Sequence, residues 1–229
     1  MFFWKAEVLP GVSVAFTDTR AGNLALHVGD NPADVRVRRE ELERSAGMVP
    51  GSLRFMNQVH GTAVALVEAG SATPEADAMV SRGVPLAVMV ADCIPAMLVG
   101  QGAGGPVLAA VHAGRPGLAA GVIPAAVEQM RALGAVGIQA WLGPSICGAC
   151  YEVPAALRDD VAAAIPATWS TTSWGTPGLD LPAGARSQLE AADVDIMYSG
   201  PCTLENEDLF SYRRNKDAGR FAGLVWSHD

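Results

Sequence analysis

The stretch VLAAVHAGRPGL, Val107–Leu118, decides how the fold is interpreted, because its pattern predicts a buried strand followed by a turn. The apolar run Val107–Val111 is typical of a strand that is covered on both faces. His112 follows directly, and the next residues include two glycines and a proline, which turn the backbone. We therefore expect His112 to be presented from the end of a rigid strand, where functional side chains commonly collect.

Other apolar runs of the chain predict further strands, and they alternate with segments that carry helix signals. We predict helices from the Asn31 cap to Gly47, across Gly117–Gly134 with a kink at Pro124, from near Pro154, and from Asp180 to Leu189. The predicted strands are Val12–Phe16, Leu24–Val28, Leu53–Val59, Ala63–Val67, Leu86–Ala91, Ala96–Val99, Val107–Val111, Ile138–Leu142, Val194–Tyr198 and Phe221–Trp226. The order lacks a strict βαβ rhythm, which favours a mixed α/β (α+β) fold, one domain over residues 1–229 with mixed β-sheets flanked by helices.

Composition narrows the classes of partner. Half of the 229 residues are hydrophobic and 17% are charged, so the chain can form a sizeable core. A net charge of −8 argues against nucleic acid or an anionic membrane as the main partner. The most apolar window, Val84–Gly100, contains Asp92 and two prolines, and the N-terminus lacks the pattern of a secretory signal. We expect a cytoplasmic protein with reduced, metal-bound or catalytic cysteines.

Three side chains that can bind a metal occupy similar places in the sequence. His60 and His112 each end an apolar run and are followed closely by glycine, and Cys93 follows the run Leu86–Ala91. These two are half of the four histidines in the chain. Each residue alone has a plainer interpretation, a hydrogen-bonded histidine or an inert core cysteine. The repetition indicates a shared site, and both interpretations stay open on the pattern alone.

If the three side chains converge, their chemistry is restricted. Two imidazoles and one thiolate give zinc three protein ligands and leave one position open, as in catalytic zinc sites. The same set suits copper with a weak axial methionine, for which Met89 and Met97 are near in sequence. A multicopper centre needs many more histidines than remain. Asp92 is a candidate general base or second-sphere acceptor, or a carboxylate that caps backbone amides.

Several other polar residues are candidates for the same pocket. Arg213 in FSYRR is a candidate phosphate ligand, because a guanidinium pairs with two oxygens at once. Asn23 and Gln58 are candidates for hydrogen bonds to ribose or base, although Asn23 also suits a turn. We interpret His27 as a packed histidine. The CxxC of Cys147–Cys150 has the spacing of a redox pair or half of a zinc site, and we favour a structural turn.

Six short motifs, in order, resemble the YfiH family, also called the laccase-domain, polyphenol oxidase or purine nucleoside phosphorylase family. They cover nearly the whole chain. The motifs are NLALHVGDNP (Asn23–Pro32), NQVHG (Asn57–Gly61), ADCIP (Ala91–Pro95), VHAG (Val111–Gly114), LGPSICGACYEV (Leu142–Val153) and LFSYRRNKDAGRFAGLVW (Leu209–Trp226).

The resemblance implies zinc held by His60, Cys93 and His112. It further implies phosphorolysis of adenosine, inosine and methylthioadenosine, with adenosine deamination as a second activity. The substrates would be a purine nucleoside and phosphate, and we expect a monomer. The family also carries two competing labels, copper-dependent polyphenol oxidase and non-catalytic peptidoglycan editing factor.

One motif departs from the family pattern. Where the family usually has His-Ala-Gly-Trp-Arg-Gly, this chain has His112-Ala113-Gly114-Arg115-Pro116-Gly117. The histidine is retained, but the tryptophan is lost and the arginine lies one position earlier. We therefore expect the pocket to differ from that of its relatives at Arg115 and Pro116, in ligand preference more than in metal binding.

Overall fold

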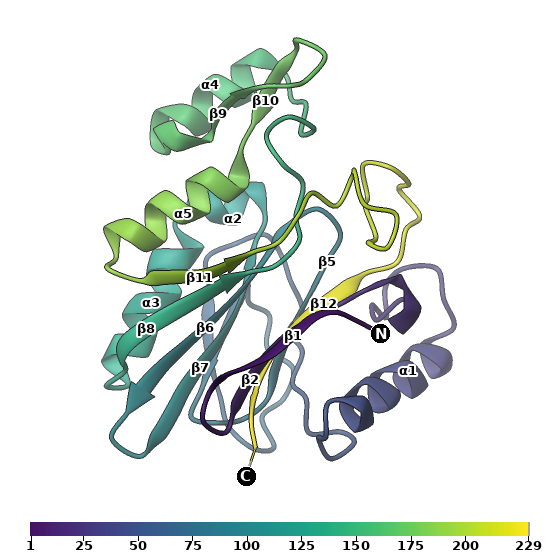
Figure 1. Cartoon of the computed structure of the whole chain (residues 1–229), viewed down its shortest axis with the longest axis vertical. Helices are drawn as coiled ribbons and strands as arrows, with labels where there is room; N and C mark the ends of the chain where they lie inside the picture. Colours follow the sequence, from purple (N-terminus) through teal and green to yellow (C-terminus); the bar gives the residue numbers. More distant parts are fainter. Residues whose placement is uncertain (229) are drawn as a thin grey trace.

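The computed structural model describes residues 1–228, and an antiparallel sheet and a mixed sheet dominate it (Figure 1). The first sheet has the order β1-β2-β12-β5 and the second the order β11-β8-β6-β7-β4-β3. Neighbouring strands are antiparallel except for the pairs β11–β8 and β3–β4, which are parallel. The strands of the first sheet are Phe2–Leu9 (β1), Val12–Thr17 (β2), Phe221–Ser227 (β12) and Leu86–Val90 (β5). Those of the second are Asp195–Ser199 (β11), Val136–Leu142 (β8), Ile94–Gly102 (β6), Gly105–Ala113 (β7), Ala78–Ser81 (β4) and Val64–Val67 (β3).

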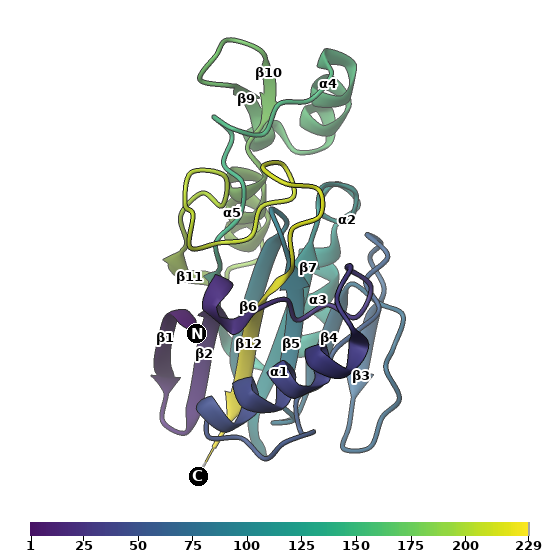
Figure 2. The same cartoon turned by 90° about the vertical axis from the view of Figure 1, so that its right-hand side faces the viewer.

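The helices cover the outer faces of the two sheets (Figure 2). Helix α1 (Pro32–Ser45) packs on the first sheet, whereas α2 (Arg115–Ala119), α3 (Val122–Ala132) and α5 (Leu181–Ala191) pack on the second. Helix α4 (Ala155–Ala164) and the hairpin of β9 (Trp169–Thr171) and β10 (Pro177–Leu179) lie at one end, at the top of both figures. This arrangement confirms the predicted mixed α+β fold. Within residues 1–228, every helix falls short of the length and apolarity that a membrane crossing requires.

Alternation along the strands explains the layers. In β12, Phe221 and Val225 face the second sheet, whereas Leu224 and Trp226 face α1. The second sheet does the same, since Met97 of β6 packs against the first sheet and neighbouring positions pack against the helices. Successive side chains of a strand point to opposite faces, so strands that are apolar throughout hold two cores at once.

Two predicted strands are wrong. Over Leu24–Val28, the side chain of Asn23 bonds to the backbone of Ala25 and Val28, which closes a turn in place of a ladder. Over Leu53–Val59 the backbone forms isolated bridges at Arg54 and Asn57. Other backbone groups there bond to side chains; for example, Leu53 N donates to the carboxylate of Glu43. His60 therefore lies in a loop and not at the end of a strand.

Three other differences concern element boundaries. Pro95 lies inside β6, and His112 lies inside β7, opposite Pro95. The predicted helix Gly117–Gly134 is two helices, because Gly121 between them has a left-handed backbone with φ of 92°. Pro124 falls in the first turn of α3, where its missing N–H is tolerated, so it does not kink the helix. The sequence prediction also missed β1, β4 and the β9–β10 hairpin.

Candidate metal centre

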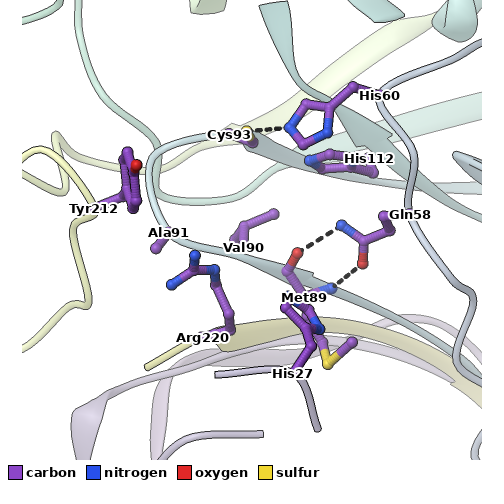
Figure 3. A pocket seen from close by; sticks show the side chains of 10 residues that line it. All are labelled: His27, Gln58, His60, Met89, Val90, Ala91, Cys93, His112, Tyr212 and Arg220. Atoms are coloured by element: carbon purple, nitrogen blue, oxygen red, sulfur yellow. Dashed lines mark hydrogen bonds between the residues drawn. The ribbon is translucent and has the colours of Figure 1, made fainter. Parts of the chain in front are cut away.

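His60, Cys93 and His112 converge from three separate segments (Figure 3). His112 projects from β7, Cys93 lies in the turn between β5 and β6, and His60 lies in the loop before β3. Each offers one ligand atom, and these atoms all lie within 4.8 Å of one another. The Cys93 Sγ is 3.9 Å from His60 Nε2, and the two imidazole rings meet edge to face with centroids 4.7 Å apart. Such spacing is compatible with one shared ion.

Unusual backbone conformations bring the three residues together. His60 has φ of 60° and Asp92, next to Cys93, has φ of 85°, both in the left-handed region that side chains other than glycine rarely adopt. Gly114 is required for a different reason: a Cβ there would lie 2.6 Å from His60 Cδ2 and 3.3 Å from Cys93 Sγ. Strain of this kind is typically retained at functional sites.

Asp77, which the sequence prediction missed, holds both histidines. Its side chain is buried, and Oδ1 accepts hydrogen bonds from His112 Nδ1 at 2.8 Å and from His60 N at 2.9 Å. Its Oδ2 accepts from Gly61 N at 2.6 Å. A ligating imidazole commonly donates its other N–H to a carboxylate, and this contact leaves His112 Nε2 free for a ligand. The sequence signal for Asp77 is its position directly before the short apolar run of β4.

The charges at the site stabilise one another. Burial opposes ionisation of Cys93, but the charge of His112 and hydrogen bonds with both histidines outweigh it and lower the pKa of this thiol to about 6. Burial likewise opposes protonation of His112, but Cys93 and Asp77 raise its pKa to about 9. Without a metal, the thiolate and the imidazolium therefore form an ion pair at neutral pH. A thiolate and two imidazoles are suitable donors for zinc and for copper.

Two cavities meet at this cluster. The first has a volume of about 340 Å³ and the second about 250 Å³. His60, Cys93, Ala91 and Tyr212 line both. The cluster is thus reached from two sides, and a molecule in either cavity would touch it.

The other predicted site residues differ in which cavity they line. Gln58 lines the first cavity, where its side chain exchanges two hydrogen bonds with the backbone of Met89, as Figure 3 shows. Asp92 and Arg213 line the second, in which Asp92 Oδ2 accepts from Arg213 N at 2.7 Å. Asn23 is buried outside both linings, and its amide bonds to neighbouring backbone, including Arg220 N. Asn23 therefore contacts the segment that carries Arg220, which lines the first cavity.

Four further residues line the cavities. His27 and Arg220 line the first, and burial lowers the pKa of both, with the charge of Arg220 acting further on His27. The expectation that His27 is merely packed thus missed its place in the cavity wall. Arg115 and Pro116, where the family pattern is broken, line the second cavity. A guanidinium and a proline ring therefore occupy a wall directly beside the metal-binding cluster.

Comparisons with known proteins identify the family to which this chain belongs. A family model described as multi-copper polyphenol oxidoreductase laccase matches residues 8–228. The chain is 48% identical to the purine nucleoside phosphorylase ORF3 of Streptomyces griseus, over 96% of each chain. It is 38% identical to the purine nucleoside phosphorylase YfiH of Escherichia coli, over 89% of this chain and 85% of that protein.

Solved structures share the fold. YlmD from Geobacillus stearothermophilus superposes with a TM-score of 0.85 at 29% identity, covering 98% of this chain and 94% of that one. The Neisseria meningitidis protein NMB0706 superposes with a TM-score of 0.84 at 33% identity, covering 100% and 99%. The similarity extends over the two sheets and the loops that carry the cluster.

Proposed function

Because this chain belongs to the multi-copper polyphenol oxidoreductase laccase family and is similar to relatives named purine nucleoside phosphorylase, we propose that it cleaves purine nucleosides with phosphate. In this reaction the bond from ribose C1′ to the purine nitrogen breaks, a bond from C1′ to a phosphate oxygen forms, and the base takes up a proton. The observation that carries the proposal is the His60, Cys93 and His112 cluster at the boundary of two cavities. Phosphorolysis needs two substrates that meet at one point, which such a boundary supplies.

We propose zinc as the resident metal. Three donors from the protein leave one position for a substrate oxygen, where zinc would act as a Lewis acid. Copper is a weaker choice, since the Met97 side chain is buried in the core between the sheets and the Met89 sulfur accepts from Arg39 at 3.3 Å. A multicopper centre would also need far more than the chain's four histidines, one of which, His228, bonds to Ser13.

The two cavities suggest an assignment of substrates. We place the nucleoside in the larger cavity, where Gln58 and Tyr212 lie, and phosphate in the smaller, where Arg213 and Arg115 bring two guanidinium groups. Arg213 is held in place, because its Nη1 donates to Glu152 O at 2.9 Å and its guanidinium stacks on Tyr151. A guanidinium fixed in this way binds an oxyanion with little loss of side-chain entropy.

Asp92 remains a predicted catalytic residue, but its contacts favour a positioning role. Its Oδ1 accepts from Thr203 Oγ1 at 2.6 Å and its Oδ2 from the backbone of Arg213. These bonds hold the turn that contains Asp92 and Cys93 against Thr203 and against the backbone of Arg213. Asn23 and Gln58, predicted to bind substrate, act in this proposal by shaping the first cavity, with Gln58 exposed to the ribose or base.

The finer parts of the proposal concern substrates and assembly. We propose adenosine, inosine and methylthioadenosine as substrates, and a monomeric, single-domain enzyme of the cytoplasm. Adenosine deamination has no counterpart in the names of the relatives. It stays a prediction that conversion of adenosine to inosine without phosphate would test.

The test is turnover of inosine by zinc-loaded protein with and without phosphate. We expect hypoxanthine to form only with phosphate, and His60→Ala to abolish the reaction. His228→Ala is the matched control, because His228 bonds to Ser13 away from both cavities, and it should retain activity. Release of hypoxanthine that is independent of phosphate, or a protein that oxidises phenols and is inactive on nucleosides, would disprove the proposal.

A separate variant tests the phosphate position. Arg213→Gln removes one charge-assisted contact, each worth about 1.5–3 kcal/mol, so the KM for phosphate should rise by roughly tenfold to a hundredfold. The KM for inosine should change much less. Arg186→Gln is the control, because Arg186 is bonded to Ser199 and lines neither cavity. Equal rises of KM for both substrates would contradict the assignment of this cavity.

A further inference from the structure

A second group of metal-binding side chains lies outside the site described above. Cys147, Cys150, Cys202 and Glu205 each offer one ligand atom, and these four atoms all lie within 4.8 Å of one another. The CxxC pair was expected to form a structural turn, and it does lie in one, since Cys147 O accepts from Cys150 N and Tyr151 N. The sequence pattern did not indicate that Cys202 and Glu205 complete a four-donor group.

The backbone brings the two halves of this group together. Ser145 and Cys202 form a parallel bridge, in which Thr203 N donates to Ser145 O at 3.1 Å. Cys147 N also points at Cys202 Sγ, at 3.4 Å. The donors are therefore arranged by main-chain contacts that do not themselves require an ion.

We propose that Cys147, Cys150, Cys202 and Glu205 bind a second zinc ion with a structural role. Three thiolates and one carboxylate supply the four ligands of a closed tetrahedral site, and the CxxC spacing is common in such sites. Cys150 and Cys202 are buried, whereas the Glu205 carboxylate is exposed, so the ion would enter from the surface. A closed site holds no position for substrate, which separates it from the cluster at His60.

The position of this second site suggests what it stabilises. It joins two segments that both contact Asp92: Ile146 N donates to Asp92 O at 3.0 Å, and Thr203 Oγ1 donates to Asp92 Oδ1. Ile146 and Tyr151 also line the smaller cavity. A zinc ion there would fasten the wall of that cavity to the turn that carries Cys93. Binding itself is independent of the proposed reaction.

The first experiment counts zinc in reduced, full-length protein that has been loaded with zinc and desalted. We expect two zinc ions per chain in the wild type, one in His60→Ala/His112→Ala and one in Cys202→Ser. A wild type that binds one ion, which the histidine double variant loses, would overturn the second site while leaving the proposed function intact. Two ions lost together in the histidine variant would overturn it as well.

The second experiment does not depend on the folding of a cysteine variant. Glu205→Gln should weaken the second zinc by more than about tenfold, the lower limit for losing even an outer contact of a metal site. Glu207→Gln, a nearby exposed carboxylate, should leave it unchanged. In the wild type, added zinc should protect Cys147 from alkylation, as located by mass spectrometry. Equal zinc affinity in both variants, or a disulfide among the three cysteines in place of protection, would contradict the proposal.

Discussion

Replacing Asp77 by asparagine should weaken zinc binding at the candidate metal centre without replacing His60, Cys93 or His112. The buried carboxylate accepts from His112 Nδ1, His60 N and Gly61 N, and a weaker contact from Val59 N has a length of 3.3 Å. Asparagine keeps one acceptor and introduces two N–H donors. Whichever way the amide is turned, donors face donors on one side of the side chain.

The size of the effect follows from these contacts. If the amide oxygen of the new side chain stays near His112, the N–H of Gly61 loses its acceptor. If the amide is reversed, its NH2 group faces His112, so His112 must present an unprotonated Nδ1. The proton then lies on Nε2, which can no longer bind a metal. A buried donor without a partner costs about 1–3 kcal/mol, and each orientation leaves at least one, so we expect a loss of roughly 1–3 kcal/mol in the free energy of unfolding. Zinc affinity at the cluster should fall about tenfold to a hundredfold.

Two measurements check this prediction on Asp77→Asn. Urea unfolding of metal-free protein gives the stability change, and competition with a chromophoric chelator gives the zinc affinity. Asp159→Asn is the control, because Asp159 is an exposed carboxylate whose ion pair is with its sequence neighbour Arg158. Zinc affinity within twofold of the wild type, together with unchanged unfolding, would refute the role assigned to Asp77.

Two further predictions concern the same cluster. Gly114→Ala should lower zinc affinity by about tenfold or more, because the added Cβ would lie 2.6 Å from His60 Cδ2. Gly104→Ala is the control, because a Cβ there would have no atom within 4 Å, and it should leave zinc affinity unchanged. Equal zinc affinities in the two variants would contradict this prediction. In metal-free protein, alkylation of Cys93 should accelerate as pH rises through its pKa of about 6 and level off above pH 7, where roughly nine in ten thiols are ionised. In His112→Ala the rise should move to higher pH, since the main stabilising charge is gone; an unmoved profile would show that His112 does not control the thiol.

The sequence predicted the ligand group better than the route by which it forms. His60, Cys93 and His112 were grouped because each was expected at a strand end, yet only Cys93 lies in a turn that joins two strands, β5 and β6. His112 is inside β7, and His60 is on a loop whose left-handed backbone no periodicity reveals. The residue types and the adjacent glycines therefore identified the group correctly, whereas the assumption that all three residues end strands was wrong.

The missed residues share a physical reason. Asp77 contacts His112 and Glu205 contacts Cys150, which are distant in sequence, and the sequence around a single carboxylate does not reveal such a partner. The strands of both sheets were predicted where apolar runs were long, as in β7 and β12. The predictions were wrong where a side chain takes the hydrogen bonds that a neighbouring strand would otherwise make, as Asn23 does with the backbone of Ala25. Hydrophobicity does not reveal this competition between side chain and strand for backbone hydrogen bonds.

Phosphorus NMR of zinc-loaded protein with inosine and phosphate tests the central proposal most directly. Cleavage at a metal site between two cavities predicts that ribose 1-phosphate appears in equal amount to hypoxanthine. It also predicts that both products disappear in His60→Ala and persist in His228→Ala. Hypoxanthine with free ribose and unchanged phosphate, or no turnover by zinc-loaded wild type, would contradict the account.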